Sequence, residues 1–217
     1  MLKELKIIKP KIYKQLNLLD FFDNEIKDED IISDSEVFDC TIEDIEADKV
    51  NIKNTIFRNV TFENVVLSRA DISDVIFENC DLSNIDLSGA VFHRVYLKNC
   101  KLLGSSFSET SLQNVRISKS NGSYANFRFS HLKNFKLEDS YFSYADFQGA
   151  EFININLQDS NISGCQLSRT KLKGIDFTSC NIDGIGVGFD EVKGAIVTSL
   201  QAVGLAKILE VVVKDNF

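Results

Sequence analysis

Two histidines and five cysteines are the residues of this 217-residue chain best suited to acid–base, nucleophilic or metal chemistry. Nucleophilic catalysis needs a Ser or Cys beside a His that a carboxylate orients, and nothing around His93 or His131 suggests that arrangement. The cysteine spacings miss the usual zinc patterns, and neither HExxH nor GxxxxGKS/T occurs. We therefore expect no catalytic residue, no metal site and no cofactor, so the chain is predicted not to be an enzyme. The cysteines are Cys40, Cys80, Cys100, Cys165 and Cys180.

The elements that carry these residues follow a five-residue period. In NCDLSNIDLSGAVF (residues 79–92) two Leu and one Phe stand five apart, whereas a helix repeats every 3.6 residues and a strand every two. Counting by fives from Val37 to Val187 gives 31 positions, and 29 of them are Val, Ile, Leu or Phe. Only Ala47 and Gly122 depart from the rule. A fixed short period of this kind predicts a solenoid.

Each five-residue unit also has a fixed pattern around its central residue. Two positions before the centre stand small residues such as Ala90 and Ala145, and all five cysteines occupy this position. Two positions after it stand Asn, Gly or Asp in 20 of the 31 units, residues that tolerate turns. Four such bends close a square, so we expect coils of four units that stack at about 4.8 Å. About eight coils would form a rod roughly 37 Å long, with the cysteines packed inside.

The units SGAVF, SYANF, SYADF and QGAEF resemble the repeat of the pentapeptide-repeat proteins, whose consensus is A(D/N)LXX. The resemblance covers roughly residues 32–197. It implies an all-β solenoid, the right-handed quadrilateral β-helix. The glycine-rich segment GIGVGF (184–189) does not lead from a strand into a helix, so we interpret it as the last, relaxed coil and not as a nucleotide loop. A rod with a filled core predicts no deep pocket.

The two ends lie outside this register, which predicts three parts. Residues 1–30 are an N-terminal extension or cap, residues 31–197 the β-helix, and residues 198–217 a capping and dimerising C-terminus. SLQAVGLAKIL (199–209) is predicted to be a short helix with Ser199 as its N-cap, and residues 211–213 a strand. The polar stripe at Gln201, Gly204 and Lys207 is too thin for a helix that only plugs its own rod, although a generous cap remains the alternative. The predicted dimer interface comprises Leu200, Val203, Leu205, Ala206, Ile208, Leu209, Val211, Val212 and Val213.

Aromatic residues at outward positions surround the irregular unit centred on Gly122. An exposed aromatic patch marks a partner site in some proteins. The same rings are equally consistent with a cover over a weak core position, and both interpretations stay open. The aromatic residues are Tyr124, Phe129, Tyr141 and Tyr144.

Three longer segments resemble one branch of the family, the Qnr-type (quinolone-resistance) pentapeptide proteins of Gram-positive bacteria. They are FHRVYLKNCKLLGSSF (92–107), SYANFRFSHL (123–132) and VKGAIVTSLQAVGLAKIL (192–209). This resemblance implies a homodimer through C-terminal helices. It also implies binding to the type II topoisomerases DNA gyrase and topoisomerase IV as a DNA mimic, with protection from quinolones.

The charge of the chain supports a DNA mimic only in part. The net charge of −8 has the wrong sign for direct binding to nucleic acid. Residues 1–48 carry 14 acids and 6 bases, whereas residues 49–217 carry 18 of each. If the protein mimics DNA, its negative charges must therefore come from the N-terminal part of the chain. The alternative function is a protein-binding scaffold with an unrelated partner. The candidate anions are Asp28, Glu29, Asp30, Asp34, Glu36, Asp39, Glu43, Asp44, Glu46 and Asp48.

The chain shows no signal for a membrane or for export. It has no apolar stretch of 18 residues, so no membrane contact is expected. The start, MLKELKIIKPKIYKQLNLLD, has lysines scattered among its apolar residues and lacks the continuous apolar region of a secretory signal. We expect a cytoplasmic protein.

Overall fold

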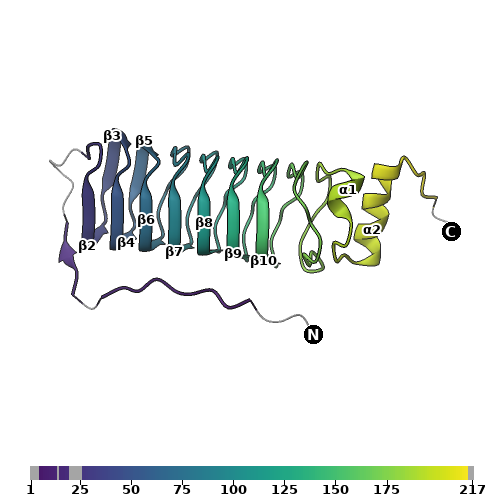
Figure 1. Cartoon of the computed structure of the whole chain (residues 1–217), viewed down its shortest axis with the longest axis horizontal. Coiled ribbons are helices and arrows are strands. Elements are labelled where there is room, and N and C mark those ends of the chain that lie inside the picture. The colour runs from purple at the N-terminus through teal and green to yellow at the C-terminus, as the bar shows by residue number, and fades with distance from the viewer. Residues whose placement is uncertain (1–4, 14, 20–25, 215–217) are drawn as a thin grey trace.

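The computed structural model describes residues 5–13, 15–19 and 26–214. The expected β-helix is confirmed: the chain winds into a solenoid of about seven turns that ends in a short helix (Figure 1). The predicted N-terminal extension and C-terminal segment fall in part on residues 1–4, 14, 20–25 and 215–217, which lie outside the described residues.

One long parallel sheet runs along the rod in the order β1-β2-β4-β6-β7-β8-β9-β10, and a second sheet pairs β3 with β5. Each residue pairs with the one 20 positions on, as Ile52 with Ile72 and Phe92 with Leu112. From residue 81 on, the other two faces continue as single bridges between turns, such as Asp81 with Lys101. The strands are β1 (Asn17–Leu18), β2 (Ile31–Phe38), β3 (Thr41–Asp48), β4 (Asn51–Arg58), β5 (Thr61–Ser68), β6 (Asp71–Glu78), β7 (Val91–Lys98), β8 (Ser111–Ser118), β9 (His131–Glu138) and β10 (Glu151–Gln158).

The corners of the coils fall on the residues predicted to tolerate turns. Residues such as Asn59, Asn79 and Asn99 have φ between 52° and 57°, in the left-handed region that Asn and Gly tolerate best. Their side chains form a ladder along the rod, because Nδ2 of Asn79 donates to Oδ1 of Asn59 (3.2 Å) and Nδ2 of Asn99 to Oδ1 of Asn79 (2.8 Å). At these corners the turn-tolerant residues therefore also link neighbouring coils by hydrogen bonds.

The core consists of the central residues of the units, stacked in columns. The rings of Phe107, Phe127 and Phe147 lie parallel, with centroids 4.8 Å apart at each step. At Gly122 the Phe142 ring of the next coil fills the space, since a Cβ there would lie 2.4 Å from it. The irregular unit is thus a place where glycine makes room for a phenylalanine, and no weak point needs a cover from outside.

The solenoid opens on one side after β10. No main-chain hydrogen bond joins residues 151–158 to residues 171–178, although the two other faces stay paired through Asn161–Asn181 and Gln166–Gly186. Phe152 is half-buried here, whereas Phe142 and Phe147 are buried as predicted. The Oδ1 atom of Asn156 is buried without a hydrogen-bond partner. We call this open side the seam.

The C-terminal part contains α1 (Phe189–Val192), α2 (Ser199–Leu205) and the 3-10 helix η1 (Ala206–Leu209). The predicted N-cap was wrong by one residue: Thr198 caps α2, and it forms a capping box with Gln201. The strand predicted at residues 211–213 as part of the dimer interface has no strand partner among the described residues of the single chain, so it stays a prediction about the dimer. Gln201, assigned above to the polar stripe, donates from Nε2 to the carbonyl oxygens of Phe177 and Cys180, both at 2.8 Å. It thereby closes the end of the rod.

At the other end of the chain, residues 5–13 run along the outside of the rod, parallel to its axis and beneath β4 to β9 (Figure 1). We call these residues the strap. The chain then returns to the N-terminal edge, where β1 pairs with β2. None of the helices in the described part of the chain has the length and apolar character to span a membrane. All five cysteines are free, and four of them are buried.

Candidate protein-binding surfaces

The predicted acidic residues gather on the first coils, but most of them are used within the rod. Asp48 accepts both Nε and Nη2 of Arg69, at 2.7 and 2.6 Å, and Asp39 accepts Nδ2 of Asn59 at 2.7 Å. Eight of the ten predicted anions have such a partner, so their charge or their lone pairs stabilise the N-terminal coils. These eight are Asp28, Glu29, Asp30, Asp34, Glu36, Asp39, Asp44 and Asp48.

Glu43 and Glu46 on β3 remain exposed and form no ion pair within the part of the chain that the structure describes. Glu63 of β5, which the sequence did not single out, lies directly beside Glu43 in the parallel register. Like charges in adjacent register positions repel each other and attract a cation. The free negative charge of this end is therefore concentrated on the outer face of the β3–β5 sheet.

The aromatic patch is arranged around two corners of the rod. Tyr124 and Tyr144, one coil apart, stack with ring centroids 5.3 Å apart and both rings largely exposed. Phe129 stands at the following corner, with the Arg128 guanidinium 5.7 Å from its ring centroid. Tyr141 is exposed one coil after Gly122, at the start of the face that ends at Tyr144.

Glycines explain why these rings lie flat on the rod. A Cβ at Gly164 would lie 2.5 Å from the Tyr144 ring, and one at Gly149 would lie 2.8 Å from the Phe129 ring. Tyr144 and Phe129 thus each cover the corner glycine of the next coil. The sequence signal was available as an aromatic residue followed by Gly 20 positions later.

The C-terminal end presents an apolar surface. Leu200 and Val212 are 82% and 80% exposed, and Val203, Leu209, Val211 and Val213 are also exposed. Leu205 packs against the core of its own rod, and Ala206 and Ile208 are partly buried. The predicted dimer residues therefore divide into an outer set and an inner set that caps the solenoid.

The strap was missed as a surface element. Three of its main-chain N–H groups donate to side chains in one corner column: Tyr13 to Asn54 (2.9 Å), Lys11 to Asp74 (2.8 Å) and Ile8 to Asn114 (3.4 Å). The three acceptor side chains are buried. The sequence signal was an unusual run of apolar residues at outward positions of one face, 20 apart: Ile56, Ile76 and Tyr96.

Asp74 is the most strongly held of these acceptors. Arg94, one coil on, donates to both of its oxygens, with Nε–Oδ1 at 2.6 Å and Nη2–Oδ2 at 2.5 Å. Burial raises the pKa of Asp74, but the hydrogen bonds from Arg94 and from the N–H of Lys11 outweigh it, so the pKa lies below its ordinary value. The carboxylate is thus kept ionised where it holds the strap.

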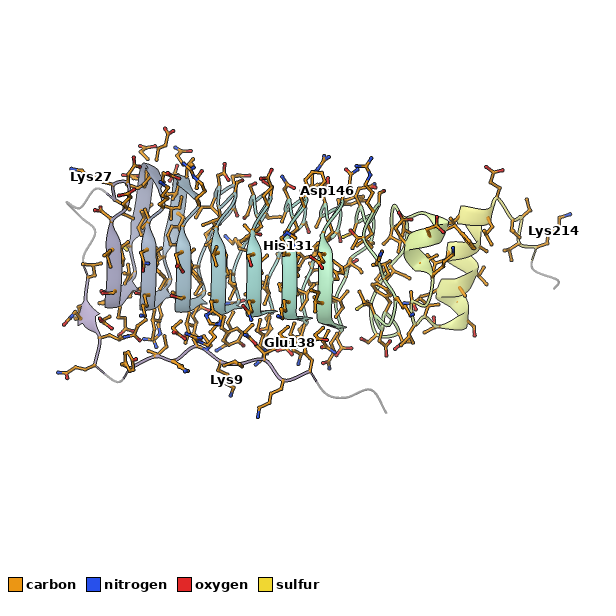
Figure 2. All side chains as sticks on the ribbon, in the orientation of Figure 1. Lys9, Lys27, His131, Glu138, Asp146 and Lys214 are labelled. Carbon is orange, nitrogen blue, oxygen red and sulfur yellow. The ribbon has the colours of Figure 1, made fainter. Side chains whose placement is uncertain are left out.

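A cleft of about 670 Å³ lies between the strap and the rod. The prediction of no deep pocket considered the rod alone, and the strap supplies the second wall. On the rod side, Arg116 lies over the Tyr96 ring at 5.0 Å, and both Arg116 and Lys136 pair with Glu138. Burial raises the pKa of Glu138, but the hydrogen bonds and charges of Lys136 and Arg116 lower it by more. The pKa of Glu138 therefore lies below its usual range. Figure 2 shows Lys9 of the strap on the same side of the rod as Glu138.

Two family models match the chain. One is described as a pentapeptide repeat region and matches residues 70–147 and 90–165; the other, described as pentapeptide repeats (9 copies), matches residues 38–101. Together they extend from residue 38 to residue 165 of the rod. No curated protein sequence matches significantly.

Among solved structures, the chain is similar to HetL, a pentapeptide-repeat protein involved in heterocyst differentiation regulation in the cyanobacterium Nostoc sp. strain PCC 7120. The TM-score is 0.54 at 18% identity, over 79% of this chain and 91% of that one. It is also similar to a trypsin-treated form of QnrB1, a plasmid-mediated fluoroquinolone resistance protein, with a TM-score of 0.46 at 22% identity over 91% and 96% of the two chains. The first likeness supports the β-helix fold.

Proposed function

Because the chain belongs to the pentapeptide-repeat family, we propose that it is a non-enzymatic scaffold that binds another protein along the surface of its rod. The observation that carries this proposal is the pair of exposed, unlike surfaces on one rigid body, the free carboxylates of the β3–β5 sheet and the stacked tyrosines. In the described residues no three His, Cys, Asp or Glu side chains gather as a metal site. The proposed role uses no cofactor, no direct contact with nucleic acid and no membrane, and it places the protein in the cytoplasm.

The partner that we propose is a type II topoisomerase, DNA gyrase or topoisomerase IV, with protection from quinolones as the outcome. The segments that resemble the Qnr-type branch support this partner, and so does the sign of the net charge. Because most acids of the first coils are already paired, mimicry of DNA would depend on the few free ones. Glu43, Glu46 and Glu63 are those anions.

We propose that the scaffold is a homodimer joined through its C-terminus. The outer set of apolar residues supports this, because Leu200, Val203 and Val212 are large, exposed and close in sequence. Such a dimer would place the free carboxylates at the two far ends of a long rod.

The aromatic surface favours a second candidate, a scaffold whose partner is unrelated to topoisomerases. Tyr124 and Tyr144 offer a flat, preformed platform with two hydroxyl groups, and tyrosine is enriched at protein interfaces. In this case the partner would contact the middle of the rod, and the acidic end would only be solvated.

The experiment that tests the proposed partner is gyrase supercoiling, and quinolone-stabilised cleavage, in the presence of the purified protein. We expect inhibition of supercoiling or relief of cleavage at micromolar concentration. A variant with Glu43→Gln, Glu46→Gln and Glu63→Gln should lose most of the effect and its salt dependence. The matched control removes three acids elsewhere that form no ion pair with the described residues, by Glu109→Gln, Asp183→Asn and Glu210→Gln.

The outcomes separate the two candidates. If the triple variant of the β3–β5 sheet acts like the wild type while Tyr124→Ala with Tyr144→Ala does not, contact runs through the aromatic surface. If the wild-type protein has no effect on either topoisomerase, the partner is another protein and the scaffold role is retained.

A further inference from the structure

The cleft between the strap and the rod has the size of a small-molecule site. Ligand pockets have volumes of about 300–1,000 Å³, and this cleft has about 670 Å³. Its rod wall is part of the face formed by β6, β7, β8 and β9, and its other wall is the first half of the strap. The lining residues are Leu5, Lys6, Ile7, Lys9, Pro10, Ile76, Val95, Tyr96, Arg116 and Lys136.

The interior of the cleft is apolar on both walls. Ile76 and Tyr96 line the cleft from the rod, and Leu5, Ile7 and Pro10 line it from the strap. The Tyr96 hydroxyl is already bonded to Oγ of Ser118 at 2.8 Å, so it leaves no unsatisfied polar group in the cleft. An apolar body would therefore find a surface that water wets poorly.

Among the described residues, the charged side chains that line the cleft are all positive. They are Lys6, Lys9, Arg116 and Lys136. Arg116 and Lys136 share the single carboxylate of Glu138 behind them. Lys6 and Lys9 are exposed and form no ion pair with the residues that the structure describes. The site thus carries uncompensated positive charge in a chain whose net charge is −8.

We propose that this cleft binds an amphipathic anion, a small molecule with an apolar chain or ring and one acidic head group. The apolar body lies between the strap and the rod wall, against Ile76 and Tyr96. The carboxylate or phosphate head lies at the rim, where Lys6 and Lys9 supply ammonium donors. Such a ligand matches both features of the cleft, whereas a neutral lipid leaves Lys6 and Lys9 without an anionic partner and a cationic lipid is repelled by the cations of the cleft.

Ligand binding is coupled to the position of the strap in this proposal. The strap has no secondary structure of its own over residues 5–13, and three main-chain hydrogen bonds attach it to the rod. A ligand that contacts both walls stabilises the closed strap by mass action. The inference is independent of the identity of the protein partner.

Isothermal titration calorimetry of the full chain with decanoate, below its micelle concentration, tests the proposal. We expect saturable binding of one decanoate per chain and much weaker binding of decanol and decylamine. The double variant Lys6→Glu with Lys9→Glu should raise the Kd about tenfold or more, which corresponds to about 1.4 kcal/mol. The matched control, Lys53→Glu with Lys133→Glu, reverses two exposed lysines on the neighbouring face and should leave the Kd within about twofold.

Two further arms keep the test decisive. Ile76→Trp fills the cleft from the rod wall and should abolish binding while circular dichroism stays that of the wild type. Dodecyl phosphate and vesicles of anionic lipid distinguish a free amphiphile from a lipid head group in a membrane. Dodecyl phosphate should bind and the vesicles should not, because the cleft accepts a free amphiphile and has no room for a bilayer. Equal affinity of the Lys6/Lys9 variant and its control, tighter binding of decylamine, or unchanged binding to the Ile76→Trp variant would each overturn the proposal.

Discussion

The carboxylate of Asp74 accepts the main-chain N–H of Lys11 at 2.8 Å, across 63 positions of the chain. The same carboxylate holds Arg94 of the next coil, so one side chain joins the strap to two turns of the solenoid. Attachment of the strap should therefore respond to the ionisation of this one group.

Acid should release the strap. The pKa of Asp74 is lowered in the folded chain, so its contribution to stability is present above the ordinary Asp pKa of about 3.9 and is lost as the pH falls through the folded value. Hydrogen exchange of residues 5–13, corrected for the intrinsic pH effect, should show protection at pH 7 that disappears below about pH 3.9.

The variant Asp74→Asn should lower the free energy of strap opening by about 1–3 kcal/mol at pH 7 and remove most of the pH dependence. Asp86→Asn, on another face of the rod, serves as the control. Full protection at acid pH in the wild type would contradict this account.

The phenylalanine column should dominate the stability of the middle coils. Phe127 stacks between Phe107 and Phe147, and Phe127→Ala should cost about 3–5 kcal/mol in denaturant unfolding. Phe129→Ala, two residues away but exposed at a corner, should cost less than about 1 kcal/mol. Equal losses in the two variants would mean that the rings of the column do not carry the core.

The corner glycines permit a prediction about the aromatic surface. Gly164→Ala combines a positive φ with a Cβ placed 2.5 Å from the Tyr144 ring, whereas Gly174→Ala meets no atom within 4 Å at a similar φ. Gly174→Ala should thus cost only the backbone strain, about 1 kcal/mol, and Gly164→Ala more. Adding Tyr144→Ala should restore Gly164→Ala to the level of Gly174→Ala in thermal unfolding. No rescue would show that Tyr144 is free to move away.

The oligomeric state can be tested without uncapping the rod. Leu200→Asp with Val212→Asp changes only the outer apolar set, so the variant should stay folded and sediment as a monomer. The wild type should sediment as a dimer at tens of micromolar. Deleting residues 199–213 should instead give a monomer or an aggregate, because Gln201 and its bonds to the last coil are lost too. A monomeric wild type would refute the dimer.

The repeat made the β-helix predictable to the residue. A period of five with a bend in every unit leaves one register, in which Ile52 must pair with Ile72, and the same arithmetic brings Tyr124 beside Tyr144. The partners of the acidic residues were not visible in the same way, because they depend on side chains one coil on, such as Asn59 beneath Asp39.

The strap escaped prediction for a different reason. Residues 5–13 have no period, and their contacts with Asn54 and Asn114 span 41 and 106 positions. The only sequence signal was the run of apolar residues Ile56, Ile76 and Tyr96 at outward positions of the rod face that the strap covers. Their meaning becomes clear only once it is known that the strap lies on that face. The N-cap of α2 could not be predicted from the sequence alone, because the two capping residues Thr198 and Ser199 stand side by side. In the structure the helix begins at Ser199, so Thr198 is the cap.

The seam after β10 has a mechanical consequence. Elsewhere main-chain hydrogen bonds join neighbouring coils along their faces, but residues 151–158 and 171–178 share no main-chain hydrogen bond. The rod therefore resists bending and tension least at this place. The block that carries α2 can tilt about the two faces that stay paired. If two chains join through their C-termini, the long rod has two such weak links, placed symmetrically about the joint. Its outer arms, each stiffened by a strap, can then bend toward a curved partner without any strain in the joint itself.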